Sequence, residues 1–89
     1  MDLKRLEDEI NETSVEFLLN DLDVAMTMLD VAETTTIKET AQRNHQNARK
    51  AYDTVLRLLP QLKLDAAQQQ TMDEQLSSLK NRLETLGWL

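Results

Sequence analysis

The residues of this chain that could do chemistry are few and scattered. His45 is the only histidine, and the positions three and four residues away from it hold Ala41, Gln42, Ala48 and Arg49 rather than a carboxylate. A metal site needs several ligands within reach, and a general base needs a neighbouring group to activate. We therefore expect His45 to have neither a metal-binding nor a catalytic role.

Other catalytic chemistry lacks its components as well. Cysteine is absent, so the sequence offers no disulfide, no thiolate metal site and no cysteine nucleophile. No nucleophile stands with its base, no acid and base pair defines a cleft, and there is no glycine-rich phosphate loop. We predict that the protein is not an enzyme and binds no metal or cofactor.

A row of basic residues suggests phosphate binding at first sight. Arg43, Lys50 and Arg57 recur every seven residues, which places them on one side of a helix. No aromatic residues lie between them to stack on bases, and the whole chain carries a net charge of −6. We therefore predict no nucleic-acid partner and interpret the row as a solvated helix face.

Charge is divided unevenly along the chain. Residues 1–36 hold ten acidic and two basic side chains, a net charge of −8, whereas residues 37–89 hold six acidic and eight basic side chains, a net charge of +2. We expect the acidic first helix to pair with the basic second helix. The alternative is an acidic surface that attracts a basic partner.

Composition predicts an all-α protein. One glycine, one proline and three aromatic residues leave little material for hairpin turns or a sheet, and 89 residues suit a single domain (1–89) with a small core. The N-terminal segment is charged, and no window approaches the roughly 18 uninterrupted apolar residues of a membrane span. We expect a soluble cytoplasmic protein with no membrane partner.

Capping boxes and helix breakers define three helices. Thr13 with Glu16 would begin a helix over 14–33, and residues 1–13 would then form an N-terminal helical extension or arm. We favour one continuous helix from Asp2 to Glu33, because the apolar spacing runs through Thr13 without a slip.

The later boundaries follow from the same signals. Thr36 with Glu39 predicts a second helix over 37–59, which Pro60 ends. Asp65 with Gln68 predicts a third helix over 66–86, ended by Gly87 with Trp88 folding back on Leu83. Two short connections make each helix antiparallel to the one before it, so we predict an up-down-up three-helix bundle.

The first helix carries two apolar stripes. One is suited to the bundle core and comprises Val15, Leu18, Leu22, Ala25, Leu29 and Ala32. The second has a heptad-like, coiled-coil spacing on roughly the opposite side and comprises Leu3, Leu6, Ile10, Phe17, Val24, Met28 and Val31. Three occupants could cover this second stripe: a second copy of the chain, a helix of another protein, or the N-terminal segment folded back over it.

The second helix has small residues on its core face. Ala41, Ala48 and Ala51 would allow another helix to approach closely, and Asn44 interrupts the apolar heptad between them. Asn44 either fixes the register of a packed helix pair or lies near water at the open end of the bundle.

Part of the second helix resembles the second helix of a tetratricopeptide repeat. The stretch Asn47–Pro60 has alanine, tyrosine, leucine and a closing proline at similar offsets. The first-helix signature of that repeat and its 34-residue period are missing, so the likeness implies a helical interaction surface rather than a repeat array.

Residues 14–86 also resemble the MIT domain, a three-helix module that binds helical peptides. Ala48, Ala51 and Tyr52 are similar to its middle helix, and Leu79, Lys80, Arg82 and Leu86 to its last helix. The resemblance implies a peptide-binding groove lined by the first and third helices.

Together these observations favour a noncatalytic helical protein–protein interaction module. We predict that it associates with itself, as a homodimer, through the second stripe of the first helix. The alternative is a small regulatory or ligand-sensing protein that holds a small molecule between helices at the alanine-rich part of the second helix.

Overall fold

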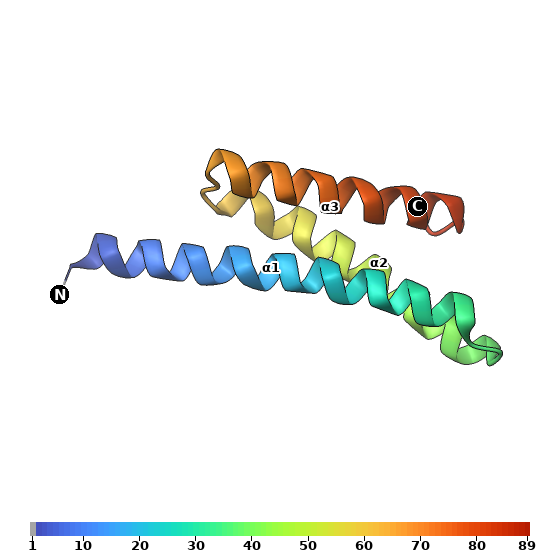
Figure 1. Cartoon of the computed structure of the whole chain (residues 1–89). Helices are drawn as coiled ribbons and strands as arrows, with labels where there is room; N and C mark the ends of the chain where they lie inside the picture. Colours follow the sequence, from blue (N-terminus) through green and yellow to red (C-terminus); the bar gives the residue numbers. More distant parts are fainter. Residues whose placement is uncertain (1) are drawn as a thin grey trace.

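Three helices joined by two short connections form the protein in the computed structural model, which describes residues 2–89 (Figure 1). Their bounds are α1 Leu3–Thr34, α2 Lys38–Leu58 and α3 Ala66–Thr85, with a short 3-10 turn, η1 Leu59–Gln61, after α2. Figure 1 shows that α2 runs back along α1 and that α3 reverses again. The predicted all-α, three-helix bundle is confirmed.

The first helix is continuous. The side chain of Asp2 caps it by accepting from the backbone N–H of Lys4 at 3.1 Å, and no break occurs at Thr13. At about 1.5 Å per residue, its 32 residues span about 48 Å. This length matches most of the 53 Å long axis of the molecule, and the first turns of α1 extend beyond the other two helices (Figure 1).

One of the two later capping boxes is confirmed. The Asp65 carboxylate accepts from the backbone N–H of Gln68 at 2.7 Å, and the Gln68 side chain accepts from the N–H of Asp65 at 3.1 Å. The box at Thr36 was wrong, because α2 begins at Lys38 with Ile37 as its N-cap. The backbone N–H of Ile37 instead donates to the hydroxyl of Thr35, at 3.2 Å, in a local turn.

Proline and glycine end the helices close to the predicted positions. Pro60 lies in η1, after α2 has ended at Leu58. Gly87 has a φ of 80°, and the next N–H, that of Trp88, donates to the carbonyl of Leu83 at 2.8 Å. This bond closes the helix end and brings Trp88 back onto the core.

The core lies along one face of α1, with α2 and α3 packed against it. The six buried residues of α1 are those of the predicted core stripe: Val15, Leu18, Leu22, Ala25, Leu29 and Ala32. The other helices contribute Ala48, Tyr52, Val55, Met72, Leu79 and Leu83. The most extensive helix contact is that of α1 with α2, which the fully buried Ala48 permits by leaving the backbones close together.

Asn11 connects the start of the bundle to the segment between η1 and α3. Its side-chain amide donates to the backbone carbonyl of Lys63 at 2.8 Å, and its side-chain oxygen accepts from the backbone N–H of Lys63 at 2.7 Å. The two bonds satisfy both backbone groups of a residue that lies outside any helix. They hold this connection against α1.

Arg82 connects α3 to the other end of α1. Its guanidinium group lies 3.0 Å from a carboxylate oxygen of Asp30 and 2.9 Å from one of Glu33, and it also donates to the backbone carbonyl of Met26. Burial alone would lower the pKa of Arg82, but the hydrogen bonds to Glu33 and Asp30 outweigh it and raise the pKa. Arg82 therefore stays charged across the whole neutral range.

Replacing Asn11 with alanine should lower the free energy of unfolding by about 1 kcal/mol, because both backbone groups of Lys63 lose their partner. Urea denaturation measures this change. Asn20→Ala is the matched control, because Asn20 is exposed on the same helix and its side chain makes no hydrogen bond within the described residues; it should leave stability unchanged or slightly higher. Equal effects of the two substitutions would show that the Asn11 bonds do not contribute.

Replacing Arg82 with glutamine should lower the free energy of unfolding by about 1 kcal/mol, and the loss should shrink as salt is added. Lys80→Gln is the control, since the one ion pair of Lys80 within the described residues is with Glu84 of its own helix, at 3.8 Å. Denaturation at low and high ionic strength measures both. A loss that is independent of salt would assign the role of Arg82 to packing rather than to its ion pairs.

Candidate functional site

The second stripe of α1 is uncovered. Every seventh residue of the helix, from Leu3 to Val31, is apolar and exposed, with exposed fractions of 70% for Leu3, 59% for Ile10, 60% for Phe17, 50% for Val24 and 41% for Val31. The N-terminal segment does not fold back, because it is part of the continuous helix. Within residues 2–89, no other segment covers these side chains.

The other two predicted stripe residues differ from each other. Leu6 is exposed like the rest of the stripe. Met28 is half-buried and packs against the core, so its prediction as a surface residue holds only in part. Met28 stands three residues after Ala25 and four before Ala32, which are both buried, and this spacing places it at the edge of the core face.

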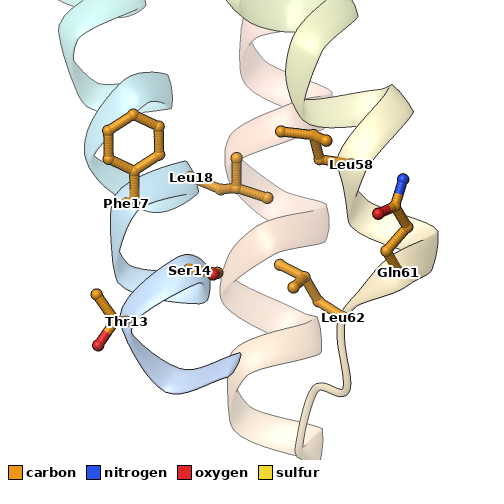
Figure 2. A pocket seen from close by; sticks show the side chains of 7 residues that line it. All are labelled: Thr13, Ser14, Phe17, Leu18, Leu58, Gln61 and Leu62. Atoms are coloured by element: carbon orange, nitrogen blue, oxygen red, sulfur yellow. The ribbon is translucent and has the colours of Figure 1, made fainter. Parts of the chain in front are cut away.

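A groove between α1 and η1 borders the stripe. Its volume is about 340 Å³, and α1 contributes Thr13, Ser14, Phe17 and Leu18 while the α2–η1 end contributes Leu58, Gln61 and Leu62. Figure 2 shows Leu18, Leu58 and Leu62 directed into the space between the helices, the Phe17 ring at its edge, and α3 behind. The groove thus opens on the face away from α3.

Two further hollows continue this groove toward the N-terminus. One of about 250 Å³ shares Ser14, Gln61 and Leu62 with it, and one of about 320 Å³ shares Thr13 and Ser14. Their apolar lining includes Leu6 and Ile10 of the stripe. The charged side chains that line them are the acidic Glu7, Asp8 and Glu9 and the basic Lys63. The result is an apolar channel with an acidic rim along the first half of α1.

Three hydroxyl groups along the stripe donate to backbone carbonyls within α1. Ser14 donates to the carbonyl of Ile10 at 2.8 Å, Thr27 to that of Asp23 at 3.2 Å, and Thr34 to that of Asp30 at 3.1 Å. A hydroxyl that already donates to its own helix demands less of a partner when it is covered. These positions are therefore compatible with an apolar contact.

The acidic and basic helices do not pair as expected. The ion pairs of residues 2–89 include none between α1 and α2. Three acidic residues of α1 are paired: Glu9 pairs with Arg5 of the same helix, and both Asp30 and Glu33 pair with Arg82 of α3. The prediction of a neutralising α1–α2 pairing was wrong, because Arg43, Lys50 and Arg57 are all exposed on α2 and none reaches an acidic side chain of α1.

Three further polar residues of α2 have partners within the protein. Asn44 donates to the carbonyl of Thr40, at 3.0 Å, within its own helix, so it does not fix a register across helices. His45 is half-buried, and its ring centroid lies 5.6 Å from that of Trp88. Arg49 holds the carboxylate of Asp53 at 3.1 Å and donates to the backbone carbonyl of Trp88. The contacts of His45 and Arg49 with Trp88 join α2 to the segment after α3.

No group of three or more histidine, cysteine, aspartate or glutamate residues within 2–89 could hold a metal ion. None of α1, α2 and α3 has both the length and the apolar character that crossing a membrane requires.

Sequence reasoning missed the far wall of the groove. Leu58, Gln61 and Leu62 come from the end of α2 and the turn after it, whereas the resemblance to the MIT domain implied a groove lined by the first and third helices. The sequence feature that could have revealed this wall is Pro60, which ends α2 and turns the chain so that Leu58 and Leu62 face Leu18 (Figure 2).

Comparison with protein-family models, curated proteins and solved structures gave no match.

Replacing both Phe17 and Val24 with glutamine should lower the free energy of unfolding by about 1 kcal/mol or less, because these side chains already contact water. Leu22→Ala is the contrasting variant: Leu22 is 0% exposed, and its truncation should cost about 2–5 kcal/mol. Urea denaturation of the three proteins measures both effects. If the double variant unfolds as readily as Leu22→Ala, the stripe belongs to the core rather than to a binding surface.

Proposed function

We propose that this protein is a noncatalytic helical interaction module that binds a helix of a protein partner on the second stripe of α1. The observation that carries the proposal is the run of five apolar residues at seven-residue spacing, exposed along a helix whose opposite face already closes the core. Large apolar side chains aligned over several turns mark a docking surface more often than solvated structure.

The bordering groove supports the same function. An amphipathic helix seated on the stripe would contact Phe17 and the apolar walls given by Leu58 and Leu62, and would reach Ile10 farther along the channel. Short chains also gain apolar burial from association, because a small domain buries a limited share of its own surface. Homodimerisation through the same stripe is the form of this function in which the partner is a second copy.

Selection from a displayed library of amphipathic helical peptides tests the proposal. The immobilised protein should enrich peptides with apolar residues at helical spacing, and the Phe17→Gln/Val24→Gln variant should lose them. Light scattering over a range of concentrations checks in parallel for association of the chain with itself. Enrichment of the same peptides on both proteins, or neither enrichment nor self-association, would overturn the proposal.

A further inference from the structure

We infer that the partner of the α1 stripe is a basic amphipathic helix, one with an apolar stripe flanked by lysine or arginine, rather than a second copy of this chain. The inference rests on the proposed function, since it concerns the same surface. It follows from the charged residues that border the stripe and from the fact that most of them form no ion pair within the described residues.

A row of acidic residues runs parallel to the stripe. If the exposed apolar residues are taken as position a of a heptad, position g holds only acidic residues: Glu9, Glu16, Asp23 and Asp30. On the other side of the stripe, position e holds Glu7, Ser14, Asp21 and Met28. Positions e and g of a helix pair meet the flanks of the partner helix and select it by charge.

Most of these acidic side chains are not neutralised by the protein itself. Glu7, Glu16, Asp21 and Asp23 form no ion pair within residues 2–89. The basic residues of α2 do not reach them, and neither Lys4 nor Lys63 forms an ion pair with them within the described residues. A partner that brings cations to both sides of the stripe would therefore gain electrostatic attraction as well as apolar burial.

A second copy would bring the same acidic residues instead. In a parallel pair of α1 helices, Glu16 of one copy would face Asp21 of the other, and in an antiparallel pair the two acidic g rows would face each other. Like charges opposed across a helix pair are unfavourable. The charge pattern thus disfavours the symmetric pair and favours a basic helix.

The acidic rim of the channel strengthens the same choice. Glu7, Asp8 and Glu9 line the hollows whose apolar walls include Leu6 and Ile10. Lys63, from the connection before α3, lines the same hollow as Glu7 and Asp8, so acidic residues outnumber basic ones by three to one among the residues that line the two hollows. Lys4 and Arg5 lie on the same part of α1, and Arg5 already contacts Glu9 at 3.5 Å.

Two synthetic helical peptides of about four heptads test the inference, both with leucine or isoleucine at positions a and d. One carries lysine at e and g, and the other carries glutamate there. Calorimetric titration into the full chain should show tighter binding of the lysine peptide, by about tenfold or more, with a difference that falls as salt is added.

Two matched charge variants locate the binding. Glu16→Lys/Asp23→Lys should weaken the lysine peptide about tenfold or more, because repulsion replaces attraction. Asp73→Lys/Glu74→Lys makes the same change in net charge on exposed positions of α3 and should have little effect. Phe17→Gln/Val24→Gln keeps every charge and should abolish binding of the lysine peptide, because it removes apolar contacts of the stripe. If this variant binds the lysine peptide as tightly as the unmodified protein, the attraction is unspecific and the inference is overturned.

The remaining outcomes separate the inference from the proposed function. Equal binding of both peptides on the stripe would leave the function standing and refute the basic partner. Light scattering that shows a dimer sensitive to Phe17→Gln/Val24→Gln, without binding of the lysine peptide, would identify a second copy as the occupant. No peptide binding and no dimer would overturn the proposed function itself.

Discussion

The structure depends on burial of one apolar face of a single long helix. Leu18, Leu22 and Leu29 of α1 are almost wholly removed from water, and both other helices contribute to the cluster that buries them. Because one helix supplies half of the buried core residues, α2 and α3 are arranged around it. Burial of this face is also what leaves the second stripe free, since helices packed on one side of a helix cannot reach the opposite side.

Polar contacts near the two ends of α1 hold the later part of the chain against this helix, in addition to the apolar core. Asn11 holds the connection before α3 against the first half of α1, and Arg82 holds α3 to the second half through Asp30 and Glu33. These two sets of contacts join α1 to α3 and to the connection before it, and not to α2. The α1–α2 contact relies on apolar packing and on small residues such as Ala48, which explains how acidic side chains of α1 remain without cations.

The channel beside the stripe arises where α2 ends. Pro60 cannot continue the helix, and the turn that follows places Leu58 and Leu62 beside Leu18 instead of extending α2 along the N-terminal half of α1. The first turns of α1 therefore face the connection before α3 rather than α2 on this side, and their apolar and acidic residues line open hollows. One helix breaker thus shapes both the fold and the candidate site.

Local features of the sequence by themselves determined the three helices, the end of α2, both ends of α3 and the two stripes. The capping box at Asp65, the proline at position 60 and the αL glycine at position 87 act through bonds within a few residues, and apolar periodicity needs only helical geometry. Only the tertiary structure decided that Met28 borders the core, that Arg82 rather than the basic row of α2 neutralises acidic residues of α1, and that Leu62 forms the far wall of the channel. These outcomes depend on how the helices are rotated and offset against one another, and short-range spacing does not encode such angles.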